Sequence, residues 1–469
     1  MVERYLRKPV PHRKAGSYSI LHRGATRIFL NETGSTIWNM VDGVSANQDI
    51  TASLVSRYRS TENLADKIAT TVDSFLNTLF IQGLLYRLND GQWKDADPSL
   101  RLGQPTPPES KDAENGKEDS IHSLQEGCMT PKLQKRENTL EESIHSLYWE
   151  KCFIEKMHVE LTYRCNFRCV HCYNTTHVGG KDELNTGEWL RVLGELAELG
   201  CYDATFTGGE IFVRKDVLEI LRAACELGFS FRINTNGSLI DEKLLQHFEP
   251  MRPYLQSFDI SFYGATPDVH DTLARRAGAH EKTVRAVRLL AQSKFPLVAK
   301  FVTMRGNFDG IDQFEKDMEE LGVPHCVHTG SLIPQTDRNQ APLVQLLTDK
   351  QYEKLLDTRR HSAGAGNPGA CRPGIIRGAI TPEGFVSPCE WLTDFKLGNL
   401  REHTLPEIWH GEKFRNFREV IEEDAECATC NLQSGCSRCP AHSYLETGNL
   451  LKCAPIQRHN AELTLAHSH

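Results

Sequence analysis

The sequence lacks the features that mark a membrane or secreted protein. No run approaches the roughly 18 consecutive apolar residues of a membrane-spanning helix, and the first residues, Met1 to Pro9, contain no apolar signal segment. Neither sign of charge is in strong excess, because the net charge is −8 and the isoelectric point is about 6.2. These absences predict a cytoplasmic protein with no nucleic-acid partner and no membrane partner.

Cysteine, in contrast, is abundant. The chain has 15 cysteines in 469 residues. The cytosol keeps thiols reduced, so cysteines in a chain without a secretory signal are more often metal ligands than disulfides. The length is enough for about three domains.

The first cysteine group lies in the stretch from Glu160 to Tyr173. Cys165, Cys169 and Cys172 are spaced C-x3-C-x2-C directly after an apolar run, 157–161, that predicts a buried strand. Three thiolates on one loop can hold three irons of a [4Fe–4S] cluster and leave the fourth iron for a small-molecule ligand. A zinc loop or three buried thiols is the alternative, although zinc favours four ligands in C-x2-C pairs.

This motif resembles the signature of the radical S-adenosylmethionine (SAM) enzymes, with His171 at a position where the family often has an aromatic residue. The resemblance implies that SAM chelates the open iron. One electron from a flavodoxin-like or ferredoxin-like donor would then cleave SAM to a 5′-deoxyadenosyl radical. It implies catalytic roles for the three cysteines and for Glu210, whose Gly-Gly-Glu sequence resembles the family motif that holds the methionyl ammonium group.

Strands and helices alternate between about residues 151 and 340. This alternation predicts a parallel sheet with right-handed crossovers, and six such units resemble the partial (β/α)6 barrel of radical SAM enzymes. The predicted strands are 157–161, 204–207, 230–235, 256–263, 297–304 and 325–329, and the predicted helices include 186–199, 216–227, 268–290 and 307–321.

Polar residues stand at the carboxyl ends of these strands, where barrel enzymes place their chemistry. Each is weak evidence alone, because Gly-Gly and Asn-Gly are also common in turns. The resemblance implies that they contact the ammonium, ribose and carboxylate of SAM, with a further contact from Arg275 or Arg276. The predicted SAM-binding residues are Gly208, Gly209, Glu210, Asn234, Ser261 and Thr303.

Residues 1–94 form a separate predicted unit. Strands at 17–21 and 26–30 precede helices at 34–40 and 49–58 and a third helix whose apolar face runs from Ala65 to Leu79. The pattern from Leu30 to Gly43 resembles the winged-helix PqqD-like domain, also called the RiPP (ribosomally made, post-translationally modified peptide) recognition element. That resemblance implies binding of a precursor's leader peptide as an added strand. A DNA-binding winged helix and a structural cap are the alternatives, but acidic and basic residues are nearly balanced here.

Residues 95–150 are rich in proline, charged residues and serine, which predicts a disordered linker.

The second cysteine group lies in residues 341–469. Cys371, Gly384 and Cys389 read C-x12-G-x4-C and predict a hairpin, 375–380 with 385–389. Of the remaining five cysteines, four follow the pattern C-x2-C-x5-C-x2-C, namely Cys427, Cys430, Cys436 and Cys439. The fifth is Cys453. The set resembles the SPASM domain, which holds two auxiliary iron–sulfur clusters, although the last gap is x2 where that family usually has x3. A zinc ribbon is the alternative, but it would leave three cysteines without partners. The resemblance implies that Cys427, Cys430, Cys436 and Cys453 bind the distal cluster and that Cys371, Cys389 and Cys439 bind the proximal one.

Together, the three regions predict a radical SAM peptide maturase that removes hydrogen from a carbon of a ribosomal precursor peptide. A cysteine thioether crosslink, of the sactipeptide or ranthipeptide type, is the expected product. Carbon–carbon or carbon–oxygen crosslinking and epimerisation are alternatives. A small-molecule maturase, such as a haem-pathway enzyme, is disfavoured by the N-terminal unit, and a non-catalytic peptide-binding scaffold is disfavoured by Glu210 and the first cysteine group.

Overall fold

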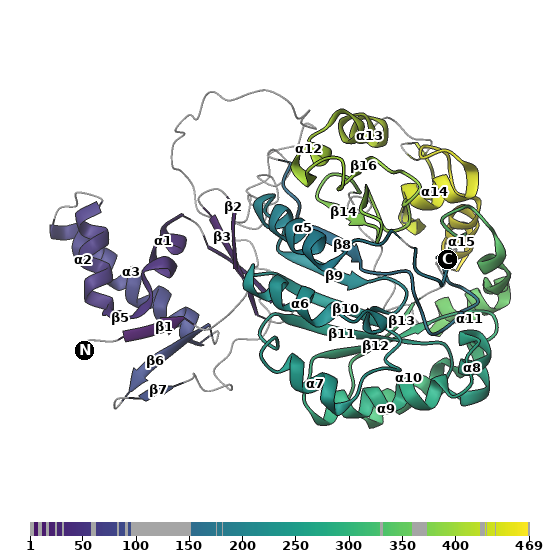
Figure 1. Ribbon diagram of the computed structural model, residues 1–469, viewed down its shortest axis with the longest axis horizontal. Helices are drawn as coiled ribbons and strands as arrows, with labels where there is room; N and C mark the ends of the chain where they lie inside the picture. Colours follow the sequence, from purple (N-terminus) through teal and green to yellow (C-terminus); the bar gives the residue numbers. More distant parts are fainter. Residues whose placement is uncertain are drawn as a thin grey trace. The chain divides into compact units, whose positions relative to one another are not determined.

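The computed structural model divides into two compact units, residues 1–145 and 146–469, which are described separately (Figure 1). The predicted linker, 95–150, and Cys371 lie outside the described residues. No helix among the described residues is long and apolar enough to cross a bilayer. The structure describes residues 4–7, 12–15, 18–23, 26–30, 32–57, 62–81, 84–89 and 92–94 and, from 152 onward, all residues except 175, 181, 329–331, 359–372, 423–426, 428, 437, 468 and 469.

The three predicted helices of the first unit are present. They are α1 (Glu32–Met40), α2 (Asn47–Arg57) and α3 (Glu62–Ile81). The apolar face predicted for α3 is buried at Val72, Leu76 and Leu79, which pack in one core with residues of α1 and α2 such as Trp38 and Leu54. Helical periodicity therefore located these elements correctly.

The strands of the first unit were only partly predicted. The two predicted strands are β3 (Tyr18–Arg23) and β4 (Thr26–Leu30), which pair with β2 (His12–Ala15) in a three-stranded sheet. A second sheet, in the order β5-β1-β6-β7, was not predicted. Its strands are short, and β1 pairs with two strands that lie far away in the sequence, β5 and β6. They are β1 (Arg4–Arg7), β5 (Asp42–Ala46), β6 (Leu85–Asn89) and β7 (Gln92–Lys94).

The second unit contains the six predicted parallel strands, which lie side by side in chain order. Figure 1 shows the helices that connect them following the outside of this curved sheet. The α/β barrel-type fold expected from the sequence is therefore confirmed. The strands are β8 (Lys156–Glu160), β9 (Asp203–Thr207), β10 (Ser230–Thr235), β11 (Leu255–Phe262), β12 (Leu297–Val302) and β13 (His325–His328).

The connecting helices match the predicted ranges to within a few residues at their ends. The helices expected around 268–290 are two, because Arg275 adopts the left-handed conformation (φ 50°) and ends the first of them. Gly278, also left-handed (φ 71°), starts the second. The helices are α5 (Thr186–Glu198), α6 (Val217–Glu226), α7 (Glu242–Phe248), α8 (Pro267–Ala274), α9 (Ala279–Gln292) and α10 (Ile311–Glu320).

The two faces of the sheet differ in chemistry. Met157 and Val159 of β8 are buried in the main apolar core, together with residues of the outer helices such as Trp189. Successive side chains of a strand point to opposite faces, so His158 and Glu160 lie on the inner face, where they face Thr205 and Thr207 of β9 in register. A parallel sheet with both faces packed against apolar groups would be hydrophobic throughout. The polar inner face therefore marks the ligand side of the barrel.

The sheet continues beyond the barrel. β14 (Arg377–Ile380) pairs parallel with β8, and β15 (Phe385–Ser387) pairs antiparallel with β14. This confirms the predicted hairpin, and a short third strand, β16 (Gly398–Asn399), extends it. The sequence did not predict that the hairpin joins the barrel sheet. Because β14 pairs with β8, the hairpin that precedes Cys389 lies beside the strand that precedes the first cysteine group.

The rest of the second cysteine region is helical. Trp409 and Phe414 of α12 and α13 pack into the main core, while Leu392, Phe417 and Ala441 form a smaller core beside them. The helices are α11 (Asp349–Thr358), α12 (Leu405–Trp409), α13 (Glu412–Glu422), α14 (Pro440–Thr447) and α15 (Pro455–Ala466), with short 3-10 helices η4 (Ala341–Gln345) and η5 (Gln433–Gly435).

Candidate active site

The first cysteine group lies on the loop of residues 161–173, called the cysteine loop below, which follows β8. Backbone hydrogen bonds tie this loop down at both ends: Leu161 N donates to Thr207 O (2.9 Å), and Val170 N donates to Leu273 O (3.0 Å). Phe167, 1% exposed, anchors its middle in a small apolar cluster. The loop is therefore held at the carboxyl end of the parallel strands, as the sequence predicts.

The three thiols of the cysteine loop lie close together. Burial raises the pKa of each of them, that of Cys172 to about 11. The neighbouring Cys172 and Cys165 raise the pKa of Cys169 further, which shows that the three groups share one site. Because iron binds thiolates, loading this site must release protons.

Gly208 and Gly209 have a steric role that the sequence did not reveal. A β-carbon on either residue would collide with backbone of the cysteine loop, at Thr162 and Arg164. The close approach allows two hydrogen bonds, from Gly209 N to Thr162 O (2.6 Å) and from Glu210 N to Arg164 O (2.9 Å). Only glycine fits here, and the Gly-Gly pair thereby fixes the cysteine loop against the end of β9.

Glu210 is fully buried at the start of the 3-10 helix η2 (Ile211–Val213). Its carboxylate accepts hydrogen bonds from the Thr235 hydroxyl (2.8 Å to each oxygen), Asn236 N (2.9 Å) and Phe212 N (3.2 Å). Burial raises the pKa of Glu210, and these hydrogen bonds to the carboxylate oppose the rise. The arrangement fixes a buried carboxylate that suits a cationic ligand.

Two other predicted SAM contacts keep buried polar atoms without a partner among the described residues. They are Asn234 Oδ1 at the end of β10 and Thr303 Oγ1 after β12. A buried polar atom without a hydrogen bond is costly, so such atoms indicate a ligand. Ser261 differs, because its hydroxyl hydrogen bonds with Tyr263 and favours that residue's ionised form. On this evidence Asn234, Thr303 and Glu210 fit SAM better than Ser261 does.

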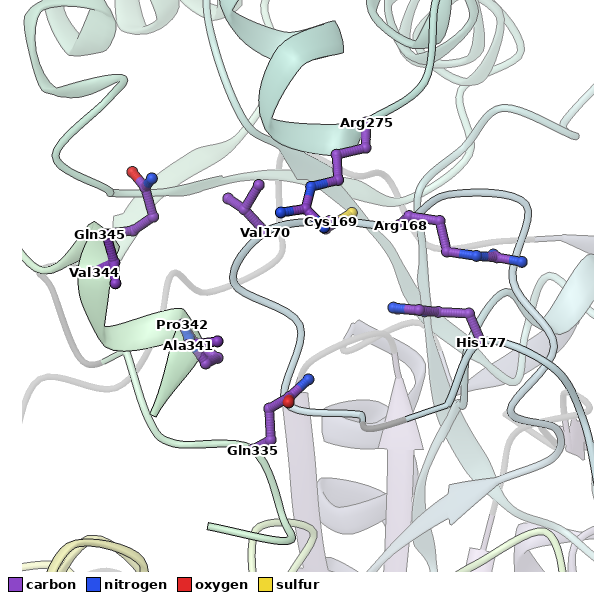
Figure 2. A pocket seen from close by; sticks show the side chains of 10 residues that line it. All are labelled: Arg168, Cys169, Val170, His177, Arg275, Gln335, Ala341, Pro342, Val344 and Gln345. Atoms are coloured by element: carbon purple, nitrogen blue, oxygen red, sulfur yellow. The ribbon is translucent and has the colours of Figure 1, made fainter. Parts of the chain in front are cut away.

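A cavity of about 690 Å³ borders the cysteine loop at Cys169 (Figure 2). Its ionisable lining groups are basic: Arg168, His177 and Arg275. Burial lowers the pKa of His177, and the two arginines lower it further. Of the two predicted arginines, Arg275 lines the cavity, whereas the exposed Arg276 does not. The cavity therefore suits an anionic group.

An aromatic residue does contact the cysteine loop, although His171 replaces the usual one within the motif. Tyr263, 7% exposed, contacts the His171 ring in a tilted arrangement, with 4.8 Å between centroids and 52° between the ring planes. Its hydroxyl also hydrogen bonds to the Cys169 sulfur, which lowers the pKa of Cys169 against the larger effect of burial. Burial lowers the pKa of His171 to about 4, so its ring is neutral. Hydrogen bonds to cluster sulfurs tune reduction potential, and the sequence did not identify Tyr263 for this role.

The second cysteine group falls into two subsets. Burial raises the pKa of Cys436, and Cys427, Cys453 and Cys430 raise it further, so these four thiols lie together. Cys389 and Cys439 share the smaller apolar core. These subsets match the distal set and the described part of the proximal set. No three Cys, His, Asp or Glu side chains within the described ranges converge as the ligands of one metal ion would.

Other cysteines are outside these groups. Cys201 and Cys225 are buried and Cys326 is half-buried, and none of the three is in a disulfide. Cys152 is disulfide-bonded in the structure, which differs from the general expectation that cysteines of this chain stay reduced.

Sequence reasoning missed two carboxylates near the cysteine loop. Glu183 accepts hydrogen bonds from the Thr162 hydroxyl (2.8 Å) and Tyr163 N (2.9 Å) and so fixes the start of the loop. Glu160, the last residue of β8, is fully buried and accepts a hydrogen bond from the Tyr173 hydroxyl (2.8 Å). A carboxylate that ends an apolar strand was the available signal for Glu160.

Comparison with known proteins agrees with this geometry. Three family models match the chain: the radical SAM superfamily over residues 159–321, the SPASM iron–sulfur cluster-binding domain over 371–440, and coenzyme PQQ synthesis protein D (PqqD) over 19–85. The chain is therefore a radical SAM/SPASM enzyme with a PqqD domain, the combination that the sequence predicts for a peptide maturase. Iron–sulfur and SAM binding follow from the first two domains.

Individual relatives share this organisation. A PqqA peptide cyclase from Granulibacter bethesdensis is 29% identical over 318 residues, which cover 62% of this chain and 83% of the relative. The crystal structure of Streptococcus suis SuiB bound to its precursor peptide SuiA has a TM-score of 0.55 at 13% identity and covers 96% of this chain and 98% of SuiB. The anSMEcpe enzyme with bound SAM and a peptide has a TM-score of 0.54 at 17% identity and covers 67% of this chain and 97% of its own. At these identities the two structures support the fold alone.

Proposed function

We propose that this enzyme modifies a ribosomally made precursor peptide, which it holds by the leader through the PqqD domain. The observation that carries the proposal is the combination of that domain with the cysteine loop and Glu210 in one chain. The relative named as a peptide cyclase and the SuiB complex with a precursor peptide support it.

Three cysteines and six residues near the strand ends would hold the cofactors of the barrel. Cys165, Cys169 and Cys172 would bind the [4Fe–4S] cluster, and Glu210 would bind the ammonium group of SAM. The remaining SAM contacts would come from Asn234 and Thr303, whose unpaired atoms face inward, and from the backbone at Gly208 and Gly209, with Ser261 in a supporting place. When bound, SAM supplies the radical that removes a hydrogen atom from a substrate carbon.

The second cysteine group would hold two auxiliary clusters. Cys427, Cys430, Cys436 and Cys453 would bind the distal one, and Cys371, Cys389 and Cys439 the proximal one. With three cysteines, the proximal site leaves room for a substrate ligand. We therefore propose a cysteine thioether crosslink as the product, with the substrate thiol at this site. A carbon–carbon crosslink is the second candidate, because the relative's name, a peptide cyclase, does not specify the bond.

The basic cavity beside Cys169 suits the docking of an acidic flavodoxin-like or ferredoxin-like electron donor, which we propose as the reductant of this cytoplasmic enzyme. Complementary charge of this kind speeds encounter and depends on salt. Added salt should therefore slow reduction by the protein donor, while reduction by dithionite should change little.

The test of the proposed function uses the short reading frames beside the gene. Each encoded peptide is incubated with reconstituted enzyme, SAM and reductant, and its mass is measured before and after treatment with a thiol-alkylating reagent. A crosslink predicts a product that has lost two hydrogen atoms, and a thioether predicts one fewer alkylated cysteine. If the enzyme cleaves SAM but alters no such peptide, the peptide assignment is wrong.

A further inference from the structure

The inner face of the barrel holds more unpaired polar atoms than SAM accounts for. Among the described residues, the buried polar atoms of the barrel without a hydrogen-bond partner include Asn234 Oδ1, Thr303 Oγ1, His158 Nε2 and Glu160 Oε2. The first two belong to the proposed SAM site. The last two lie on a single strand, β8, and are not among the residues predicted to hold SAM or iron.

Glu160 is arranged to present one oxygen. Oε1 accepts the hydrogen bond from the Tyr173 hydroxyl at 2.8 Å, which fixes the carboxyl group. The Tyr163 hydroxyl also interacts with this carboxyl group and lowers its pKa, but no described residue lies in hydrogen-bonding position to Oε2. The side chain is fully buried. Leaving such an oxygen unpaired costs free energy that folding does not recover, so a partner from outside the chain is expected.

The location of Glu160 identifies that partner. On one side Glu160 raises the pKa of Cys172, beyond the larger effect of burial, so it lies close to the first cysteine group. On the other side its own pKa, raised by burial to about 7, is raised further by Glu390 and Glu383. Glu390 contacts Cys389, whose Sγ lies 3.3 Å from Glu390 Oε2. Glu160 therefore stands between the two cysteine groups.

Glu160 lies on β8, between β9 and β14. Thr207 of β9 pairs with it in register on one side, and β14 runs parallel to β8 on the other. Glu210, by comparison, bonds to residues at the end of β10, two strands from β8. His158, two residues before Glu160 on the same face, is half-buried with a buried Nε2, and burial lowers its pKa, so its ring is neutral. Glu160 Oε2 can accept a hydrogen bond, and His158 Nε2 belongs to a neutral imidazole. Together they suit a polar group that is either uncharged or cationic.

We propose that His158 and Glu160 form the binding site for the peptide residue that the enzyme modifies, and that Glu160 Oε2 accepts a hydrogen bond from an N–H or O–H group of that residue. The inference rests on the proposed function and adds the place and chemistry of the reacting residue. Held there, the residue lies between the cluster that generates the radical and the cysteines that take part in the second half of the reaction. Glu160 is a substrate-binding residue in this assignment, with Tyr173 as the positioning residue behind it.

The test compares Glu160→Gln with Glu155→Gln in the full, reconstituted chain. Glu155, 4% exposed, stands just before β8, at the far end of the strand from the cysteine loop, so it is a buried control for the same chemical change. The probe is the precursor peptide that wild-type enzyme converts in the mass assay above. Three quantities are measured: SAM cleavage without peptide, peptide affinity, and the rate of product formation.

For Glu160→Gln we expect peptide-free SAM cleavage and peptide affinity within about twofold of wild type, because the cysteine loop and the leader site are intact. Assayed above pH 7, where a carboxyl group with a pKa of about 7 is mostly ionised, product formation should fall about 10- to 100-fold, the loss expected for one hydrogen bond to a charged group. Glu160→Asp, which keeps the charge but withdraws the oxygen, should recover part of this loss. Glu155→Gln should convert peptide at the wild-type rate.

Product formation by Glu160→Gln within threefold of Glu155→Gln would overturn the assignment while leaving the proposed function intact. Loss of peptide-free SAM cleavage in both Glu160 variants would also overturn it, because it would show that Glu160 supports the cysteine loop and does not bind peptide. Failure of the proposed function is distinct, since wild type itself would then convert no peptide.

Discussion

The two cysteine groups are built in different ways. The first occupies one loop of residues 161–173, which lies at the ends of parallel strands and is fixed by backbone hydrogen bonds to Thr207, Gly209 and Glu210. The second is dispersed over turns, the ends of helices and the segment after a hairpin, and its described members come together only through a small apolar core and mutual proximity. The first site is therefore set by local sequence and the sheet, and the second by tertiary packing.

This difference predicts which substitutions should disrupt each cysteine group. The hairpin β14-β15 connects the two groups, because β14 pairs with β8 and Cys389 follows β15. Apart from this connection, the residues that hold one group do not hold the other. Changes in one group should accordingly spare the other.

The largest effect is expected from the first group. Replacement of Cys165, Cys169 and Cys172 by alanine should reduce SAM cleavage to background, at least about 1000-fold, because no cluster then binds SAM. Iron content should fall from roughly 10 to 12 per chain by about 4, with the auxiliary signals still visible by electron paramagnetic resonance. Surviving SAM cleavage would contradict the assignment of the first group.

A backbone change should separate the loop from the sheet. Gly209→Ala places a β-carbon against Arg164 backbone, so the cysteine loop must move, at a cost of about 3 kcal/mol or more. We expect loss of the first cluster and of SAM cleavage, measured by iron content and 5′-deoxyadenosine formation. Gly194→Ala is the matched control, because a β-carbon on Gly194 of α5 has no neighbour within 4 Å and alanine favours helix. Equal behaviour of the two variants would show that the close approach at Gly209 is unimportant.

The converse experiment disrupts the second group. The double variant Cys430→Ala, Cys436→Ala should lose the distal cluster, about 4 irons, and stop peptide conversion, while peptide-free SAM cleavage should stay within a few-fold of wild type. Zinc in place of iron at these cysteines would favour the zinc-ribbon alternative. Loss of SAM cleavage in this variant would mean that the two groups are not independent.

A region without cluster cysteines provides a third point of comparison. A shortened chain that begins near Trp149 lacks the PqqD domain, so conversion should fall steeply at low peptide concentration and recover in part when peptide is raised. SAM cleavage without peptide should persist. Peptide affinity of the full chain should depend only mildly on salt, because strand addition uses backbone hydrogen bonds. An affinity that collapses in salt would instead indicate an electrostatic partner.

The smallest effect concerns a buried histidine behind the cysteine loop. Burial, with a smaller effect of His280, lowers the pKa of His270 to about 4, below the ordinary value of 6.5. The unfolded chain therefore binds this proton first as pH falls, and the free energy of unfolding declines between the two pKa values and levels off below the lower one. Between about pH 7 and pH 5, wild type should lose about 1–2 kcal/mol more than His270→Gln in denaturant unfolding. Equal losses would contradict a neutral, buried His270.

The sequence predicted the parts of this molecule that depend on contiguous residues. The cysteine loop, the six strands, the helices and the Cys389 hairpin all carry local periodicity or fixed spacing, and the structure contains them. The sheet β5-β1-β6-β7 was missed because its strands are too short to show a clear period-two pattern and because β1 pairs with β5 and β6 over long distances in the sequence. The role of Gly208 and Gly209 in packing the loop, and the network from Tyr173 to Glu160, depend on contacts between separate segments. The spacing of residues along the sequence cannot predict such contacts.

One measurement tests the central claim most directly. The converted precursor peptide is prepared with deuterium on its carbon atoms and incubated with wild-type enzyme, reductant and SAM, and the 5′-deoxyadenosine formed is analysed by mass spectrometry. If the radical generated at the cysteine loop acts on the peptide, one deuterium should appear in 5′-deoxyadenosine for each product molecule. Crosslinked product without deuterium in 5′-deoxyadenosine would contradict hydrogen abstraction from a peptide carbon.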